Sequence, residues 1–454
     1  MKIIIVGCGK VGCTIIENLI SEGHDITAVD IDPNTVSDLA NIYDIMGVCG
    51  SGTDCDTLTE AKADSAELLI SVTGSDEFNM LSCFLARKIG TKHTIARIRN
   101  PQYNDRNLPF LEKELNLSMT INPELSAAKE LANILKLPSA VKIETFSQGG
   151  FEMIELNLKE NSILNGIDLI GLRRKFSENF LVGVVQRGND VYIPDGKFTL
   201  QSGDKIGITA KNSDIQHLLK ELSLDAKSAR RIMILGATTT AFYLAKLLIE
   251  DGIYNVKIID SDPKRCLEFS EKLPEAVIIN GDGANQEILL EEGIDNADAF
   301  VALTGLDEEN ILLSYFASTR NVPKIITKIN RVEFLPTAEK LGLDCIVSPR
   351  KTIADVTLRY ARALQNSIGS KVETLYKIMD NKAEALEFKV TSDCSIINIP
   401  FKLLNTKPNI LVAGIVRGRK TIIPTGEDMI LPDDRVVVLS AGQILNDLSD
   451  IVKR

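Results

Sequence analysis

Apolar and polar residues alternate along this chain with two different periods, which predict two kinds of secondary structure. The short apolar runs Ile3–Val6 and Leu68–Val72 predict buried strands, and Val11–Ser21 carries apolar residues at helical spacing. Because strands of this kind alternate with helices, the pattern predicts a parallel sheet covered on both faces. Further elements are expected as strands at Asp25–Asp30, Thr94–Arg97 and Ser118–Ile121, and as a connecting helix at Glu124–Leu135 that Pro138 closes.

A shorter pattern of alternating residues follows this first region. Arg187–Asp190 and Gln201–Asp204 have the composition of tight turns between strands. The pattern predicts a small α+β domain with strands at Phe151–Leu158, Leu181–Arg187 and Lys205–Thr209.

The whole pattern occurs twice. Lys2–Gly7 matches Arg231–Gly236 at an offset of 229, and Thr73–Glu77 matches Thr304–Glu308 at an offset of 231. Such a steady offset predicts the duplication of a unit of about 230 residues. Three further pairs agree: Val29–Pro33 with Ile259–Pro263, Gly50–Gly52 with Gly281–Gly283, and Ile193–Gly196 with Ile423–Gly426.

The duplication predicts an α/β fold of four domains. Two Rossmann-like doubly wound parallel-sheet domains are expected at 1–138 and 227–367, each followed by a small α+β domain, at 139–226 and 368–454. The second copy repeats the connecting helix at Thr352–Leu364 and the small-domain strands at Ala385–Val390, Ile410–Arg417 and Arg435–Ser440.

A glycine-rich turn, Gly7-Cys8-Gly9-Lys10-Val11-Gly12, joins the first strand to the first helix. Glycine permits a tight turn and lets backbone N–H groups approach phosphates, while the helix start supplies unpaired donors and partial positive charge. Asp30 ends the next strand, 18 residues after Gly12, where an acid accepts hydrogen bonds from ribose and opposes a 2′-phosphate. This arrangement favours NAD(H) or a simple adenine nucleotide over NADP. The alternative is a glycine turn that serves packing alone.

Other residues near this turn have a binding interpretation and a structural one. Lys10 is placed to contact a β- or γ-phosphate, which suits ATP or ADP as well as NAD(H), or it is solvated. Thr73 and Gly74 follow a strand whose end borders the crevice, but the two residues after them are equally suited to cap a helix. Arg97 ends the fifth strand and either reaches the crevice or lies on the surface. Asp32 is expected to cap the next helix.

The second copy keeps the acid, Asp260, but only the first glycine of its loop. Thr238 carries a Cβ where close backbone approach is needed, and Ala241 replaces the third glycine. Because threonine hydroxyls can themselves donate to phosphate, nucleotide binding in this half stays open. The candidate residues are Gly236, Ala237, Thr238, Thr239, Thr240 and Asp260.

Composition narrows the functional classes. The chain has 51 basic and 62 acidic residues, a net charge of −11, which repels phosphate backbones, so nucleic-acid binding is not expected. No apolar run approaches the roughly 20 residues that cross a bilayer, and the start is too short for a signal peptide, so a cytoplasmic protein is expected. Three unpaired histidines predict no metal site. Eight cysteines without a C-x-x-C pair are expected mostly as small buried hydrophobes.

No Cys/His, Ser/His/Asp or Tyr-x-x-x-Lys set follows either glycine turn, and the small repeated domains are unlike a substrate domain. A nucleotide site without catalytic groups is typical of a sensor rather than an enzyme. Two alternatives remain: an NAD-dependent oxidoreductase, which needs a catalytic group beside the nicotinamide, and a structural dimer with a vestigial nucleotide site.

Four segments carry a family resemblance: Met1–Gly12, Val29–Asp30, Val72–Met80 and Ile95–Arg99. With the tandem arrangement, they make the chain resemble the peripheral nucleotide-binding subunit of Trk-type potassium uptake systems, which carries two RCK domains. The resemblance covers essentially the whole chain.

The resemblance implies a cytoplasmic ring, an even-numbered homo-oligomer such as a dimer or tetramer, held at the inner face of the cell membrane by a separate potassium-translocating pore subunit. Exchange of ATP or NADH against ADP or NAD is then expected to reshape the ring and gate the pore, with no catalysis. By position, it places the phosphate loop at Gly7, Cys8, Gly9, Lys10 and Val11, the ribose contact at Asp30, the crevice contacts at Thr73, Gly74 and Arg97, and the second set at Gly236–Thr240 and Asp260.

Overall fold

The computed structural model describes most of the chain. The residues outside this description are 104–106, 138, 147–149, 177–179, 223, 225–227, 254, 344, 367–371, 380–381, 444, 446 and 454, together with the side chains of 102, 332, 365–366 and 372–374. The expected helix end at Pro138 and the domain boundaries expected at 138, 226–227 and 367–368 therefore lie outside the described residues.

The chain folds into two compact units, and each unit combines two separate stretches of sequence. Unit 1 consists of Met1–Lys129 with Val347–Ala361, and unit 2 consists of Glu130–Ile346 with Arg362–Arg454. Two long helices, α6 (Pro123–Lys136) and α14 (Pro349–Asn366), each begin in unit 1 and end in unit 2.

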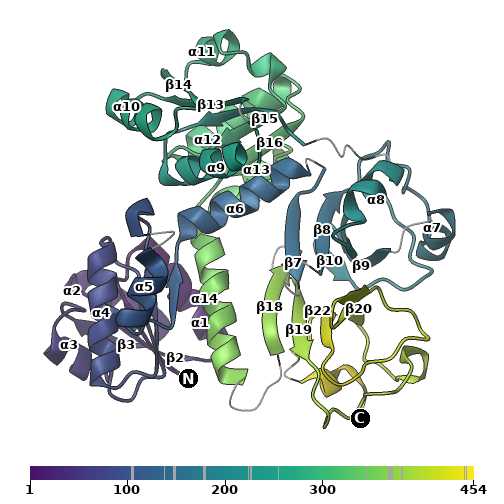
Figure 1. Ribbon diagram of the computed structural model, residues 1–454, viewed down its shortest axis with the longest axis horizontal. Coiled ribbons are helices and arrows are strands. Elements are labelled where there is room, and N and C mark those ends of the chain that lie inside the picture. The colour runs from purple at the N-terminus through teal and green to yellow at the C-terminus, as the bar shows by residue number, and fades with distance from the viewer. Residues whose placement is uncertain are drawn as a thin grey trace. The chain divides into compact units, whose positions relative to one another are not determined.

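Unit 1 contains a six-stranded parallel sheet in the order β3-β2-β1-β4-β5-β6, with helices on both faces (Figure 1). All four residues of β4 are buried, as a strand covered on both faces requires. The elements are β1 (Lys2–Val6), β2 (Asp25–Asp30), β3 (Met46–Cys49), β4 (Leu68–Ser71), β5 (His93–Arg97), β6 (Met119–Ile121), α1 (Lys10–Ser21), α2 (Pro33–Tyr43), α3 (Cys55–Glu60), α4 (Asp76–Ile89) and α5 (Asn107–Glu114).

Helix α2 begins where the sequence predicts a cap. The carboxylate of Asp32 accepts hydrogen bonds from Asn34 N at 3.1 Å and from the hydroxyl of Thr35 at 2.7 Å. Pro33 occupies the first helical position, where its missing N–H is not needed. The expected capping role of Asp32 is confirmed.

Unit 2 contains a second parallel sheet with the equivalent order, β14-β13-β12-β15-β16-β17. The pairing registers of β12 with β13 and β15 reproduce those of β1 with β2 and β4. The elements are β12 (Arg231–Leu235), β13 (Asn255–Asp260), β14 (Val277–Asn280), β15 (Ala299–Ala302), β16 (Lys324–Lys328), β17 (Ile346–Val347), α9 (Thr239–Glu250), α10 (Pro263–Lys272), α11 (Gln286–Glu291), α12 (Asp307–Thr319) and α13 (Leu335–Lys340).

Unit 2 also contains two five-stranded antiparallel sheets, with the equivalent orders β10-β9-β11-β8-β7 and β21-β20-β22-β19-β18. The first has β7 (Lys142–Phe146), β8 (Phe151–Asn157), β9 (Phe180–Arg187), β10 (Asp190–Tyr192) and β11 (Lys205–Lys211), with helices α7 (Leu169–Lys175) and α8 (Ile215–Glu221). The second has β18 (Val372–Ile378), β19 (Ala383–Lys389), β20 (Ile410–Arg417), β21 (Lys420–Ile422) and β22 (Arg435–Ala441).

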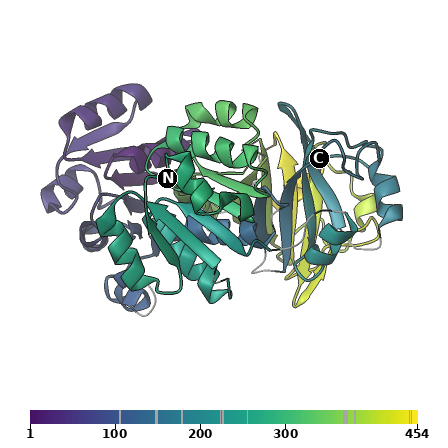
Figure 2. The same ribbon diagram turned by 90° about the horizontal axis from the view of Figure 1, so that it is seen from above.

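These two small sheets pack face to face, as Figure 2 shows near the C-terminus. A buried apolar cluster with residues from both sheets lies between them. A Cβ on Gly183 would lie 2.3 Å from Leu439 Cδ1, and one on Gly414 would lie 2.5 Å from Phe151 Cζ. Glycine at both places therefore permits the close approach. The predicted fold class, two doubly wound domains each followed by a small α+β domain, is confirmed.

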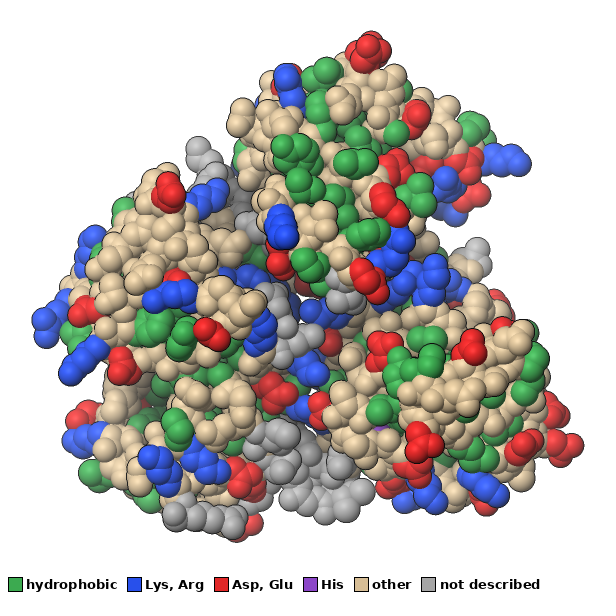
Figure 3. Space-filling view, turned by 180° about the vertical axis from the view of Figure 1, so that it is seen from behind, with side chains coloured by type: hydrophobic (Ala, Val, Ile, Leu, Met, Phe, Trp, Pro, Cys, Tyr) green, Lys and Arg blue, Asp and Glu red, His purple; other side chains and the backbone are tan. Residues whose placement is uncertain are grey.

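Charged side chains of both signs are spread over the visible surface (Figure 3). Acidic and basic side chains both occur on each of the parts visible in Figure 3. Among the described residues, no helix combines the length and the apolar character that a bilayer crossing requires.

Candidate functional site

The turn between β1 and α1 is shaped by its glycines. Gly7 has a φ of +90°, and a Cβ on it would lie 2.9 Å from the backbone nitrogen of Thr73. A Cβ on Gly12 would lie 2.1 Å from the carbonyl oxygen of Gly7. A Cβ on Gly9, in contrast, would meet nothing within 4 Å. The loop is tightly packed at its two ends and open in the middle, where α1 begins.

Helix α1 starts without a side-chain cap. Gly9 is its N-cap residue, and the first turn contains no acidic residue. The first N–H groups of a helix have no partner within the helix and carry partial positive charge. The side chain of Lys10, the first helical residue, is exposed. This end of α1 therefore offers backbone donors and a nearby cation to an anion.

Asp30 closes the loop from the neighbouring strand. Its Oδ2 accepts a hydrogen bond from Cys8 N at 2.6 Å, and its Oδ1 accepts one from Asp32 N at 3.0 Å. Each carboxylate oxygen has more than one acceptor position. The carboxylate of Asp30 thus fixes the loop and can still accept a further hydrogen bond from a hydroxyl group.

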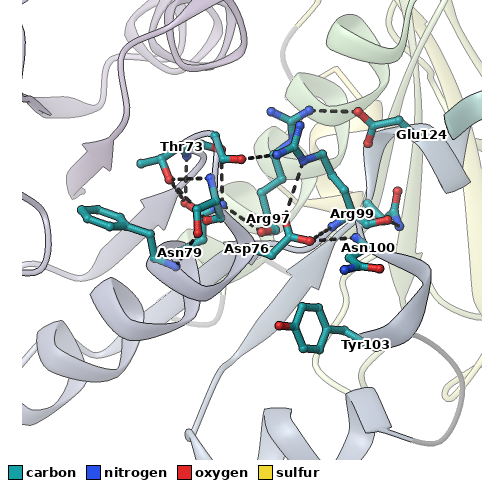
Figure 4. Close-up of polar contacts among 12 residues, drawn as sticks. Thr73, Asp76, Asn79, Arg97, Arg99, Asn100, Tyr103 and Glu124 are labelled. Atoms are coloured by element: carbon teal, nitrogen blue, oxygen red, sulfur yellow. Dashed lines mark hydrogen bonds and ion pairs between the residues drawn. The ribbon is translucent and has the colours of Figure 1, made fainter. Parts of the chain in front are cut away.

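Thr73 belongs to a hydrogen-bonded cluster built on Asn79, which Figure 4 shows. Oδ1 of Asn79 accepts from Thr73 N at 2.8 Å and from the Thr73 hydroxyl at 2.7 Å. Its Nδ2 donates to the carbonyl oxygen of Arg97 at 2.9 Å. One buried amide therefore holds the carboxyl ends of β4 and β5 together beside the loop.

The two residues after Gly74 have different roles. Ser75 caps α4, since its hydroxyl accepts a backbone N–H from the first turn at 3.2 Å. Asp76 instead accepts from Arg99 N at 2.8 Å and Asn100 N at 2.7 Å, and so anchors the segment after β5. The carbonyl of Gly74 accepts from the Arg99 guanidinium, and a Cβ on Gly74 would meet nothing within 4 Å.

Arg97 ends β5 and makes an ion pair rather than lying free on the surface. Its Nη2 is 2.9 Å from Oε1 of Glu124 (Figure 4), and the two side chains are only 12% and 18% exposed. Burial lowers the pKa of the Arg97 guanidinium, and the charge of Glu124 opposes that shift. Among the described residues, Nε of Arg97 and Oε2 of Glu124 have no hydrogen-bond partner although both are buried.

The equivalent turn in the second half has the same backbone but different chemistry. Gly236 has a φ of +97°, close to the value at Gly7. Thr238 stands where the first half has Gly9, and its hydroxyl accepts from Ala241 N at 3.4 Å. Helix α9 therefore begins with a side-chain cap, and the hydroxyl expected to face a phosphate serves the helix instead.

The acid of the second half is also more fully engaged. Asp260 accepts from Ala237 N at 2.7 Å and Asp262 N at 2.8 Å, which reproduces the first half. In addition, Nη1 of Arg265 lies 3.2 Å from its Oδ2. Thr35, which carries no charge, stands at the position of Arg265 in the first half.

The remaining predicted residues of the second loop do not converge on one face. Thr239 is exposed, Thr240 is 4% exposed, and Ala237 is buried. Lys328, at the position of Arg97, donates to the carbonyl of Leu303 at 3.1 Å.

The anchoring residues recur in both halves. Asn310 repeats the bonds of Asn79, accepting from Thr304 N at 2.9 Å, and Asp307 accepts from Asn330 N at 3.0 Å. Sequence reasoning passed over Asn79 and Asp76 as functional positions. The signal that identifies them is their exact recurrence at the duplication offset, at Asn310 and Asp307.

Most of the cysteines are buried, as expected. Cys8, Cys83, Cys266, Cys345 and Cys394 are buried, and burial with the nearby Asp30 charge raises the pKa of Cys8 to about 12. Cys49 and Cys55 are exposed, because they lie at the end of an edge strand and at the start of a short helix, and Cys13 is partly buried. The described part of the chain contains no cluster of His, Cys, Asp and Glu that could hold a metal ion.

Fold and loop geometry define a tandem pair of Rossmann-type domains, each with a small antiparallel domain. The TrkA-N domain family matches residues 3–123 and 232–349, and the TrkA-C domain family matches 153–223 and 385–453. The chain belongs to the TrkA family.

Relatives match over the full length. The Trk system potassium uptake protein TrkA homolog 1 of Methanosarcina mazei is 31% identical, with 100% of both chains covered. The Trk system potassium uptake protein TrkA of Vibrio alginolyticus is 29% identical, over 96% of this chain and 95% of its own.

Solved structures share the fold. The GsuK channel superposes with a TM-score of 0.65 at 17% identity, covering 97% of this chain and 77% of its own. The GsuK RCK domain gives 0.64 at 18% identity, covering 97% and 92%. The GsuK channel bound to NAD gives 0.63 at 17% identity, covering 97% and 77%. At such identities the likeness concerns the fold alone.

Proposed function

We propose that this chain is the regulatory subunit of a potassium transporter, that it senses adenine nucleotides, and that it gates a separate membrane pore subunit. Family membership supports the transport role, since the relatives are named potassium uptake proteins. The proposal includes a cytoplasmic position at the inner face of the membrane through the pore subunit, and an even-numbered homo-oligomer.

The nucleotide proposal depends on one observation. Helix α1 starts without a side-chain cap, and the space beside Gly9, its N-cap residue, is free of other atoms. The backbone N–H groups there fit a phosphate group, and the carboxylate of Asp30 fits a ribose hydroxyl. NAD(H), ATP and ADP share these parts. The residues proposed to hold the nucleotide are Gly7, Cys8, Gly9, Lys10, Val11, Gly12, Asp30, Thr73, Gly74 and Arg97.

For the second crevice we propose a weak site or a scaffold. Thr238 caps α9 and Arg265 neutralises Asp260, so the groups that would meet phosphate and ribose already have partners within the chain. A ligand would have to displace both interactions before it gained its own.

We propose a sensor rather than an enzyme. The crevice residues described above are glycines, a loop-bonded acid, and side chains tied to one another. The alternative, an NAD-dependent oxidoreductase, predicts oxidation of NADH by some candidate substrate, whereas the sensor predicts none across a broad substrate panel.

Gating requires that the nucleotides bind the closed and open states with different affinity, since equal affinity shifts nothing. The terminal phosphate is the natural discriminator, because it is the charge that differs between ATP and ADP. Lys10 and Arg97 are the cations proposed to respond to it.

Two measurements test this function together. Isothermal titration of the purified chain with NADH, ATP and ADP should show saturable binding of at least one of them. Potassium flux through the pore subunit in proteoliposomes should then differ between ATP and ADP when the chain is present. Absence of binding to all three nucleotides would contradict the sensor, and nucleotide-independent flux would contradict the gating role.

A further inference from the structure

We infer that Glu124 competes with the nucleotide's phosphates for the guanidinium of Arg97, so that the ion pair is a latch that phosphate opens. This inference rests on the proposed function. It adds a way in which a nucleotide bound in the first crevice affects helix α6, which begins beside that crevice.

Arg97 of this ion pair lies within reach of the phosphate loop. Arg97 ends β5, which is the second neighbour of β1 in the order β1-β4-β5. Strands are spaced about 4.8 Å apart, so roughly 10 Å separates its Cα from the end of β1, where the phosphate loop starts. Asn79 fixes the backbone of Arg97 by a hydrogen bond to its carbonyl oxygen. The guanidinium can therefore pair either with Glu124 or with a phosphate in the crevice, but not with both in full.

The pair is only partly satisfied as it stands. Arg97 uses Nη2 for Glu124, while its Nε and the second carboxylate oxygen of Glu124 are buried without partners among the described residues (Figure 4). Buried polar atoms without a partner are costly, so a competing anion with several acceptor oxygens gains from the unused donor Nε. When Arg97 turns to a phosphate, Glu124 loses this ion pair and leaves its buried position at a cost that the nucleotide must offset.

Glu124 is the second residue of α6, and the same helix ends in unit 2. There the carbonyl of Leu135 accepts from Ala229 N at 3.0 Å, and Lys136 Nζ lies 2.8 Å from Asp251. Helix α6 is thus anchored at its end to the second Rossmann-type domain and at its start to the first crevice. Release of Glu124 loosens the start, and this is the means by which phosphate binding reaches the rest of the chain.

The second half lacks the equivalent pair. Lys328 stands at the position of Arg97, and Arg350 follows the proline that begins α14, where Glu124 follows the proline that begins α6. Two cations at these positions cannot form the latch. The device therefore belongs to the first crevice alone, which is also the one proposed to bind nucleotide.

The test compares Glu124→Gln with wild type in isothermal titrations of ATP, ADP and adenosine. Glu124→Gln keeps the shape and removes the competing charge, so ATP affinity should rise about tenfold, a typical coupling between linked events. Adenosine affinity should stay the same, because adenosine carries no phosphate to reach Arg97. Glu308→Gln is the matched control: it removes an exposed ion pair with Arg331 in the second half, makes the same change of charge, and should alter neither affinity.

A second readout follows the helix. ATP should speed amide hydrogen exchange in the first turn of α6 in wild type, and Glu124→Gln should show the faster exchange without ATP. A fall in ATP affinity in Glu124→Gln, or equal affinities in all three proteins, would overturn the latch and leave the proposed function intact. No binding of ATP, ADP or adenosine to wild type would instead contradict the proposed function itself.

Discussion

The two crevices of this chain share their framework and differ in the groups that a ligand would meet. Both have a left-handed glycine after the first strand, an acid that binds the loop backbone, and an asparagine that joins two strand ends. In the first half the helix start is uncapped and the uncharged Thr35 stands where the second half has Arg265, whereas in the second half Thr238 caps the helix and Arg265 pairs with Asp260.

The difference shows that the same backbone turn can be used in two ways, to bind an anion or to stabilise its own helix. A hydroxyl at the N-cap stabilises a helix by about 1 kcal/mol, but it uses the donors that would otherwise bind an anion. The first copy leaves those donors available, and the second copy uses them for its own stability. We therefore propose that the duplication provides one nucleotide site and one scaffold of similar shape rather than two equal sites.

The largest expected effect comes from giving the first loop the residue of the second. Gly9→Thr places a side chain in open space, so the fold should be retained, and the new hydroxyl caps α1. Nucleotide affinity measured by titration should fall about 100-fold, or about 2.7 kcal/mol. The matched exchange Thr238→Gly should leave that affinity unchanged, and an affinity of Gly9→Thr equal to wild type would remove the physical basis of the comparison.

The shared asparagines should separate stability from binding. Asn79→Ala and Asn310→Ala each leave the two donors of a threonine, Thr73 or Thr304, without their acceptor, at a cost of about 1–3 kcal/mol. Chemical denaturation should show similar destabilisation for both variants. Only Asn79→Ala should also weaken nucleotide binding; equal effects on binding would mean that the second crevice is a site as well.

Lys10→Ala should reduce ATP affinity more than ADP affinity, by up to about tenfold, because the side chain is exposed and its attraction to phosphate is screened by water. Titration at low and high salt checks the electrostatic origin. Thr239→Ala, at the equivalent position, is the control. Unchanged ATP affinity and unchanged discrimination between ATP and ADP would refute a role for Lys10.

The smallest effect concerns the cysteines. Iodoacetamide at pH 8 should label Cys49 and Cys55, which are exposed and both lie in the first half, while Cys8 stays unmodified. The pKa of Cys8 is raised to about 12, so its reactive thiolate is scarce at pH 8 and increases only as the pH approaches that value. Peptide mass spectrometry reads out the sites, and rapid labelling of Cys8 would show that the loop opens more than its packing allows.

The sequence predicts the fold well where strands are buried on both faces. The short apolar runs of β1 and β4 predict these strands to within one residue of their observed ends. The edge strands β3 and β14 are harder to predict, because each exposes its first and last residues and β3 has no continuous apolar run. The sharing of α6 and α14 between units also has no local signal, since it depends on tertiary packing.

The sequence motif of the candidate site could be predicted, but the hydrogen bonds and ion pairs between its side chains could not. The glycine turn and Asp30 are recognisable from spacing, but the partner of Arg97 lies 27 residues away and meets it only in the folded sheet. Thr238 was judged by its bulk, while its capping hydroxyl proves the more important property. Placement of the nucleotide contacts themselves stays a prediction.

Calorimetric titration of the wild-type chain with its best-binding nucleotide, with Gly9→Thr in parallel, tests the central comparison most directly. Two unequal crevices predict one high-affinity nucleotide per chain in wild type and none in Gly9→Thr. Two equivalent nucleotides per chain, or a full complement retained by Gly9→Thr, would contradict it.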